Sequence, residues 1–462
     1  MAKIFESVTE LNKALEGIVE RDDTCVKILD ENKLRESLID DLIYTAVFGK
    51  TDLIRYEAME IIRDIANDFG AIPASIHDFY MAMGRGEVDN ITTPAINIRG
   101  MTYDVARQIF KLANNKNVGA FIFEIAKSEI GYTYQRPAEY ASAVLAAAIK
   151  EGYRGPVFIQ GDHFQFNAKK YQEDPQKEYE AIKELTEEAI VSGFYNIDVD
   201  ASTLVDYSKP TLKEQQYHNY LNTARLTKFI REIEPAGITV SVGGEIGHIG
   251  GKNSTVEEFE AFMEGYLEEL PEGMAGISKI SVQTGTEHGG VPLPDGRIAD
   301  VKLDFNVLKE IGEVARKKYG LGGTVQHGAS TLPDELFDKF PQSNCCEIHL
   351  ATGFQNIMYD LIPDDFRNEI YNWIKENLKN EWKEGQTEAQ FIYKTRKKGF
   401  GPFKYEWWTL DKEYKDKIME ALYNKFEFLF EKLNVFDTKE LVEKYVKPRK
   451  VPFGCIRKVK RI

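Results

Sequence analysis

The sequence predicts an α/β protein, a (β/α)₈ TIM barrel with a helical extension at each end. Between residues 94 and 356, short apolar or β-branched runs alternate with longer amphipathic stretches. Eight strand-then-helix repeats over roughly 260 residues have the length and rhythm of such a barrel. We therefore expect a helical N-terminal extension at 1–90, the barrel domain at 91–356 and a helical C-terminal extension at 357–462.

Apolar periodicity justifies the elements in chain order. Leu34, Leu38, Leu42 and Ile43 recur at the spacing of one helix face, and residues 54–69 repeat this pattern. The eight predicted strands that follow are 95–98, 120–125, 156–161, 195–200, 239–243, 279–283, 324–326 and 346–351. Helical patterns fit between them, for example at 138–150, 178–191, 212–233, 256–267 and 307–317.

The C-terminal part is helical and rich in aromatic residues, including Trp373, Trp382 and the pair Trp407-Trp408. Between its helices lies a basic, glycine-containing segment at 394–404. This segment is consistent with a solvated loop or with a loop that binds an anion such as phosphate.

A doubly wound parallel sheet is the rival architecture. Its nucleotide-binding fingerprint would be a glycine loop after the first strand. The glycine-rich stretch 243–251 instead follows the fifth predicted strand. We therefore do not expect a dinucleotide site.

Composition excludes several classes of function. The net charge of −15 disfavours nucleic-acid binding, because most of the surface would repel a polyanion. No apolar run approaches the length of about 20 residues that spans a membrane, and the first residues lack the apolar core of a signal peptide. Four cysteines without C-x-x-C spacing indicate no disulfide scaffold. We expect a cytoplasmic protein without nucleic-acid or membrane partners.

Polar residues follow the predicted strands at the end where barrels carry their active sites. Three of the seven histidines, His163, His288 and His327, stand at three such positions. Imidazole nitrogens suit Zn²⁺, and three protein ligands leave a coordination position open for substrate. Glycines beside two of the histidines allow close approach of an anion, so Gly328, Ser330 and Thr352 are candidate phosphate contacts.

Five motifs in order resemble the class II metal-dependent ketose-bisphosphate aldolases, over residues 94–356. They are Gly161-Asp162-His163, Asp200-Ala201-Ser202, the stretch 244–251, Gly285-Thr286-Glu287-His288-Gly289 and His327-Gly328-Ala329-Ser330. The resemblance implies Zn²⁺ on the three histidines and Asp162 as the catalytic acid and base. It places Asp200 and Glu245 in a secondary metal-site region, and it leaves room for a monovalent cation. Further substrate or phosphate contacts are expected at Ser128, Ser202 and Gly289.

The chain departs from the family pattern at two places. Lys252-Asn253 stands where the family usually has a glutamate, and Glu129, Glu257 or Glu287 are candidates to replace it. Near the last strand, His349-Leu350-Ala351-Thr352 stands where a pattern like N-I-D-T is common. His349 is expected to replace the asparagine in binding the substrate, whereas Ala351 cannot hydrogen-bond a hydroxyl. We therefore expect the basic segment, above all Arg396 with Lys397 and Lys398, to hold the distal phosphate.

The expected activity is reversible cleavage of a ketose bisphosphate, most simply fructose 1,6-bisphosphate, to dihydroxyacetone phosphate and glyceraldehyde 3-phosphate. Two alternatives stay open: a ketose 4-epimerase that uses the same retro-aldol chemistry, and a noncatalytic partner subunit of a tagatose-bisphosphate aldolase. The stretch Glu124–Ser128 resembles such partner subunits. We expect a homo-oligomer, either a dimer or a tetramer.

Overall fold

The computed structural model of the chain describes residues 2–22, 26–247, 252–285, 293 and 303–451. Its centre is a closed barrel of eight parallel strands, in which the last strand pairs with the first and the third with the fourth. The strands are β4 Thr93–Asn97, β5 Ile122–Ala126, β6 Gly155–Gln165, β7 Asn196–Asp200, β8 Ser241–Glu245, β9 Lys279–Val282, β10 Thr324–Gln326 and β11 Cys345–Leu350. The predicted barrel is confirmed.

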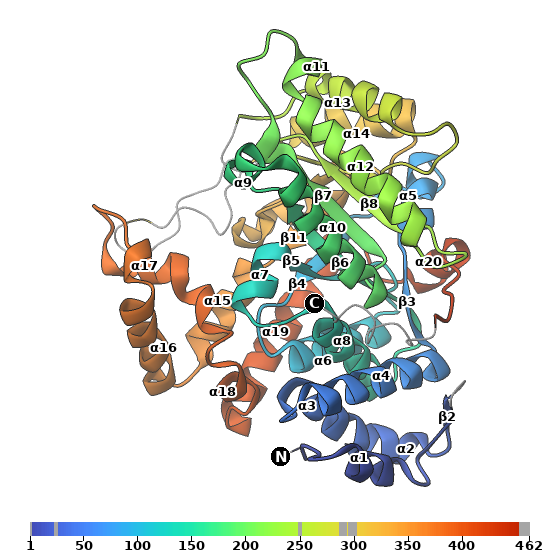
Figure 1. The fold of residues 1–462 in the computed structure, drawn as a ribbon, viewed down its shortest axis with the longest axis vertical. Coiled ribbons are helices and arrows are strands. Elements are labelled where there is room, and N and C mark those ends of the chain that lie inside the picture. Colours follow the sequence, from blue (N-terminus) through green and yellow to red (C-terminus); the bar gives the residue numbers. More distant parts are fainter. Residues whose placement is uncertain (1, 23–25, 248–251, 286–292, 294–302, 452–462) are drawn as a thin grey trace.

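Helices between the strands cover the outside of the barrel (Figure 1). They include α6 Thr102–Asn115, α8 Pro137–Glu151, α10 Pro175–Val191, α12 Tyr217–Ile233, α13 Val256–Glu269, α14 Phe305–Tyr319 and α15 Thr352–Leu361. Local sequence fixes their ends. Thr255 and Glu258 form a capping box at the start of α13, and Gly320 ends α14 in the left-handed conformation.

A ninth parallel strand, β3 Ala71–Ala74, joins the sheet from the N-terminal segment. It pairs with the first residues of β6, from Gly155 to Phe158, and β7 pairs with β6 only beyond that point. Asn196 at the start of β7 binds the end of β3. Its side chain accepts a hydrogen bond from the Ile76 N–H at 2.9 Å and donates one to the Ala74 carbonyl at 3.2 Å. The N-terminal extension, which was expected to be helical, thus also contributes a strand to the sheet.

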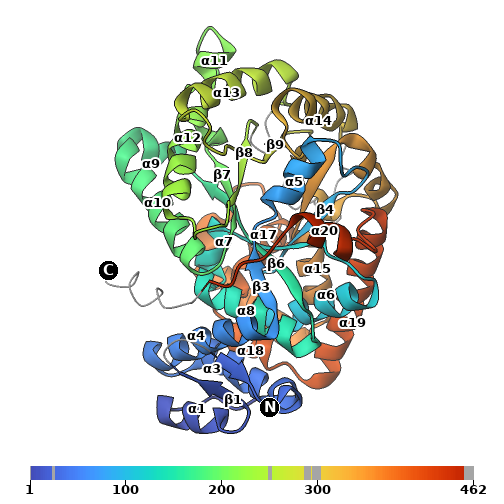
Figure 2. The same cartoon turned by 90° about the vertical axis from the view of Figure 1, so that its right-hand side faces the viewer.

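Most of the rest of the N-terminal extension packs below the barrel, whereas its last helix, His77–Gly84, lies beside α14 (Figure 2). It contains α1 Val8–Leu15, the antiparallel hairpin β1 Val19–Arg21 and β2 Val26–Ile28, α2 Glu31–Lys33, a π-helical turn Leu34–Leu38, α3 Ile39–Phe48, α4 Asp52–Phe69 and α5 His77–Gly84. Leu34, Leu38 and Leu42 are buried, as their helical spacing predicts. Helices α3 and α4 both contact α8, so this extension covers one side of the barrel.

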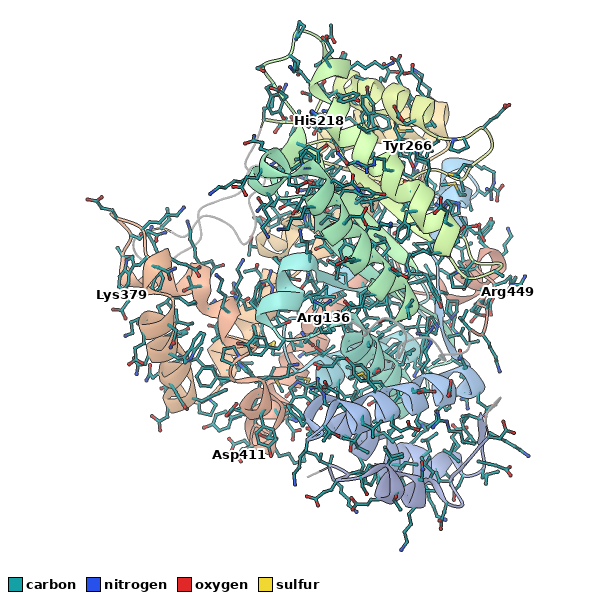
Figure 3. All side chains as sticks on the ribbon, viewed as in Figure 1. Arg136, His218, Tyr266, Lys379, Asp411 and Arg449 are labelled. Atoms are coloured by element: carbon teal, nitrogen blue, oxygen red, sulfur yellow. The ribbon has the colours of Figure 1, made fainter. Side chains whose placement is uncertain are left out.

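The C-terminal extension is helical. Its first part, residues 364–408, projects beside the barrel with Lys379 in its outer part (Figures 1 and 3), whereas its last helix lies on the opposite side of the molecule, against α5. It contains α16 Asp364–Asn377, α17 Glu388–Thr395, a 3₁₀ turn Arg396–Gly399, α18 Lys404–Trp408, α19 Lys412–Lys432 and α20 Lys439–Tyr445. Its core is aromatic: the Trp407 ring lies 4.8 Å from Phe400 and 5.2 Å from Tyr359, between ring centroids. None of the described helices combines the length and apolarity that crossing a bilayer requires.

Candidate active site

A cavity of about 760 Å³ lies at the carboxyl end of the barrel strands. The cavity is lined by residues at or just after the ends of seven of the eight strands and by one residue of the C-terminal extension. Its lining includes Asn97, Arg99, Glu124, Lys127, Ser128, Glu129, Tyr132, Asp162, His163, Gln165, Lys170, Glu245, His327, Gly328, Ser330, His349, Ala351, Thr352 and Lys397.

A bulge in β6 brings both Asp162 and His163 into this cavity. Successive side chains of a regular strand point to opposite faces, so one of the two would normally face away from the barrel interior. The pairing of β6 with β7 shifts register between Gly161 and Phe164, and His163 has a φ of 41°, which is uncommon for a residue other than glycine. A Cβ on Gly161 would lie 2.5 Å from the Phe164 ring, so the bulge also requires this glycine.

His163 is held by two carboxylates behind it. Its Nδ1 lies 3.0 Å from Asp200 Oδ2 and 3.3 Å from Glu245 Oε2. Asp200 ends β7 and is fixed in turn by the Ser202 hydroxyl at 2.6 Å and the Gln165 amide at 2.5 Å. The His163 and His327 rings face each other with centroids 4.1 Å apart.

These contacts set the protonation of the carboxylates. Burial would raise the pKa of Asp200, but the hydrogen bonds from His163, Ser202 and Gln165 outweigh it and keep the pKa below its usual value. Burial and the negative charge of Asp200 raise the pKa of Glu245 to about 7, against the opposing effect of His163. The two carboxylates behind His163 therefore differ in proton affinity.

The donor set in this part of the cavity fits a Zn²⁺ ion. Asp162, His163 and His327 each offer a ligand atom within 4.8 Å of the others. With Nδ1 of His163 directed at Asp200, Nε2 is the nitrogen left to bind a metal. A carboxylate that accepts from one ring nitrogen commonly orients an imidazole whose other nitrogen binds a metal. His163, Asp200 and Glu245 form a second such group. The third expected histidine, His288, and the neighbouring Gly289 lie outside the described residues.

His349 links Asp162 to the interior of the barrel. Its Nδ1 lies 3.0 Å from Asp162 Oδ1 and 3.2 Å from Glu124 Oε2, and its Nε2 lies 2.6 Å from Glu347 Oε1. Both ring nitrogens thus face carboxylates. Burial would lower the pKa of His349, but Glu124 and Asp162 outweigh it and raise the pKa well above its usual value. His349 is therefore an imidazolium that can donate to Asp162.

Deeper in the barrel, Lys279 on β9 joins this chain of charges. Its ammonium lies 2.5 Å from Glu347 Oε1, 2.9 Å from Asp198 Oδ1 and 2.7 Å from Gln160 Oε1. The side chains of Lys279 and Glu347 are fully buried. A Cβ on Gly243 would clash with Asp198, so the glycine at this position leaves room for the ion cluster.

The structure separates the other predicted site residues into groups. Ser128, Gly328, Ser330 and Thr352 line the cavity. Ser202 lies behind the cavity, bonded to Asp200. Arg396 lies outside the lining: its guanidinium donates to Asn356 Oδ1 at 2.6 Å and packs over the Tyr359 and Tyr393 rings. The adjacent Lys397 lines the cavity instead.

Sequence reasoning found Glu129 as one of three candidates for the missing carboxylate, and Glu129 lines the cavity. It missed Arg99, Glu347 and Lys279. A signal for Glu347 and Lys279 was present, because polar or charged residues alternate with apolar ones in Cys346-Glu347-Ile348-His349-Leu350 and in Lys279-Ile280-Ser281-Val282. Such alternation indicates a polar face directed into the barrel.

Three solved structures resemble the chain along most of their length. A probable tagatose 6 phosphate kinase from Sinorhizobium meliloti gives a TM-score of 0.52 at 13% identity, covering 79% of this chain and 96% of that chain. A fructose-bisphosphate aldolase from Campylobacter jejuni gives 0.47 at 16% identity, covering 78% and 94%. The YdjI aldolase from Escherichia coli gives 0.45 at 13% identity, covering 79% and 98%.

At these identities the first of the three structures supports the fold alone. No curated protein matches the chain. The family model described as fructose-bisphosphate aldolase class II matches residues 84–403, which is well over half of the sequence. The chain therefore belongs to the class II fructose-bisphosphate aldolase family.

Proposed function

We propose that the chain is a Zn²⁺-dependent aldolase that reversibly cleaves a ketose bisphosphate, with fructose 1,6-bisphosphate as the expected substrate. The products would be dihydroxyacetone phosphate and glyceraldehyde 3-phosphate. The observation that carries the proposal is the convergence of Asp162, His163 and His327 in one cavity, with ligand atoms within 4.8 Å of one another. Membership of the class II aldolase family supports the reaction class.

His163, His327 and His288 are the proposed metal ligands, with Asp200 and Glu245 in the surrounding region. A Zn²⁺ ion bound there would polarise the ketone carbonyl and stabilise the negative charge that cleavage leaves on the ketone fragment. Asp200 contributes by fixing the orientation of the His163 ring through its 3.0 Å contact.

Asp162 is the proposed acid and base. During cleavage its carboxylate would accept the proton of the C4 hydroxyl as the C3–C4 bond breaks, and during synthesis it would return this proton to the aldehyde oxygen. Donation from His349 Nδ1 to Asp162 Oδ1 at 3.0 Å holds the carboxylate in place.

Gly328, Ser330 and Thr352 are the proposed contacts for the phosphate of the ketone fragment. All three line the cavity. Gly328 has a φ of 70°, a conformation that glycine adopts without strain and that brings the backbone close to a ligand. Ser330 and Thr352 supply hydroxyl donors.

A time course by ³¹P and ¹³C NMR tests the proposal. The zinc-loaded chain with fructose 1,6-bisphosphate should form the two triose phosphates together, and the same mixture should arise from the triose phosphates. Ala351 lines the cavity where the family pattern has an aspartate, so the aldehyde half of the substrate is the half for which the alternatives must be tested. Formation of a C4-epimeric ketose without free triose phosphates would support the 4-epimerase, and turnover only after addition of another aldolase subunit would support the partner-subunit role.

A further inference from the structure

A second cavity, of about 570 Å³, lies outside the barrel, where helices α4, α8 and α10 meet the short helix α7 Lys127–Tyr132. Helix α8 contacts both α4 and α10, and the three helices lie side by side on one face of the molecule (Figure 1). Helix α7 borders both cavities: Glu129 lines the first, Ile130 lines the second, and Lys127 and Gly131 line both. The volume is within the range of pockets that bind small organic molecules.

Apolar side chains from four helices line this second cavity. Met59 of α4, Ile130 of α7 and Ala138 of α8 are buried there, and Leu185 and Val191 of α10 complete the apolar surface. A molecule with an apolar body that filled the cavity would remove this surface and its own from water, which favours binding.

Ion pairs and hydrogen bonds hold the helices around the cavity. Arg136, which precedes α8 and is labelled in Figure 3, forms a bidentate pair with Glu188 of α10, with Nε 3.0 Å from Oε1. Arg63 of α4 donates to the Ser192 carbonyl at 2.7 Å and to the Tyr195 hydroxyl at 3.0 Å. The cavity is therefore formed before a ligand binds, which lowers the entropy lost on binding.

Arg55 of α4 brings a donor without a partner to this cavity. Among the residues that the structure describes, its Nε is buried and makes no hydrogen bond. Its terminal nitrogens lie 3.6 Å from Asp52 Oδ1 and 3.7 Å from Glu139 Oε2, beyond hydrogen-bond distance. Glu139 accepts instead from Lys404 at 2.5 Å. Because buried N–H donors almost always have an acceptor, Arg55 is the group that indicates which ligand suits the cavity.

The other charged groups of the lining are engaged or solvated. Lys127 donates to the Gln165 carbonyl at 2.7 Å, and Arg136 and Glu188 pair with each other. Glu184 is exposed, so solvent and salt screen its charge. The guanidinium of Arg55 is therefore the charged group with donors to offer, and its natural partner is an anion.

We propose that this cavity is a second ligand site and that it binds an organic acid with an apolar body. The apolar part would lie against Met59, Ile130 and Leu185, and the acid group would accept from the Arg55 guanidinium, whose fork of donors matches a carboxylate or a sulfonate. The ligand would also contact α7, the helix that borders the proposed active site. This inference does not rest on the proposed function.

Two fluorescent probes of nearly equal shape test the site. Anilinonaphthalene sulfonate carries an acid group on its aromatic rings, whereas phenylnaphthylamine has the same rings without the acid. The sulfonate should bind the folded, zinc-free chain at one saturable site. Arg55→Met should weaken its binding by about 10- to 100-fold, the factor for losing a charge-assisted hydrogen bond, and that of the neutral probe by less than about 2-fold. Arg154→Met is the control, because Arg154 pairs with Glu31 at 2.7 Å and does not line the cavity.

A second pair of variants locates the probes. Ala181 is exposed on α10 at the edge of the cavity, so Ala181→Trp should fill the cavity and abolish binding of both probes, while circular dichroism shows an unchanged fold. Ala389→Trp is the control, because Ala389 is exposed on α17 and does not line the cavity. No saturable binding to the wild-type, equal binding by the two tryptophan variants, or equal effects of Arg55→Met on the two probes would overturn the inference. Since neither zinc nor a sugar is present, the result is independent of the proposed reaction.

Discussion

Replacing Lys279 by methionine removes the central cation of the ion cluster inside the barrel. The side chain of Lys279 is 0% exposed, and its ammonium lies 2.9 Å from Asp198 and 2.5 Å from Glu347. Burial favours the neutral amine, but the two carboxylates outweigh it and raise the pKa of Lys279 above its usual value. The lysine is therefore charged, and methionine preserves most of the packing of its stem.

The size of the effect follows from the two carboxylates left behind. Burial, followed by other effects that include the negative charge of Glu347, raises the pKa of Asp198 to about 6, so Asp198 can take up a proton near neutral pH at small cost. Glu347 differs, because Lys279 and His349 together overcome burial and lower its pKa to about 2. Removing one partner of a buried ion pair costs about 3–5 kcal/mol, and we expect Lys279→Met to destabilise the chain by this amount.

Guanidinium unfolding followed by circular dichroism measures the change. Lys318→Met is the control, because Lys318 makes an equally short contact of 2.5 Å with Glu260 on the surface and should leave the midpoint unchanged. Lys279→Met combined with Glu347→Gln should recover part of the loss, since the two residues interact directly. If Lys279→Met lowered the free energy of unfolding by less than about 1 kcal/mol, which is the range of exposed ion pairs, the buried cluster would not stabilise the chain as we expect.

Two further variants separate metal binding, proton transfer and stability. Asp162→Ala should retain zinc, measured by atomic absorption, while cleavage falls by roughly 10²-fold or more; loss of the zinc would instead make Asp162 a ligand. His77→Gln should flatten the pH dependence of stability, because burial, with Arg231 adding its charge, lowers the pKa of His77 to about 4 from 6.5. Between pH 6.5 and about 4 the unfolded chain therefore binds one proton more than the folded chain. Through His77, the free energy of unfolding of the wild-type falls by about 2–3 kcal/mol between pH 7.5 and 4.5. Equal pH dependence in unfolding of both proteins would contradict this assignment.

The barrel was predictable because its strands are short β-branched or apolar runs that alternate with amphipathic helices. Strand β3 was not, because Ala71-Ile72-Pro73-Ala74 is short and contains a proline. It is a strand only because β6 and Asn196 provide partners distant in sequence. Tertiary pairing of this kind leaves no local pattern.

The site was predictable where polar residues follow strands, as at Asp200, Glu245 and His327. The Asp162–His163 bulge was not, because regular alternation would direct the two side chains to opposite faces. The basic segment was expected to direct Arg396 above all to the substrate, whereas Lys397 is the residue of this segment that lines the cavity. In the 3₁₀ turn, the side chain of Lys397 faces the cavity and that of Arg396 contacts Asn356. The directions of the two side chains depend on how the turn packs against Tyr359 and Phe400.

Zinc titration of the metal-free chain tests whether cleavage depends on a zinc ion held by His163 and His327. Triose phosphate release from fructose 1,6-bisphosphate is measured while Zn²⁺ is added after dialysis against a chelator, with His163→Ala and His327→Ala as comparisons. We expect no cleavage without metal, full cleavage after about one equivalent of Zn²⁺ per chain, and no restoration in either variant. Full cleavage in excess chelator, or a lysine adduct trapped by borohydride, would contradict the account.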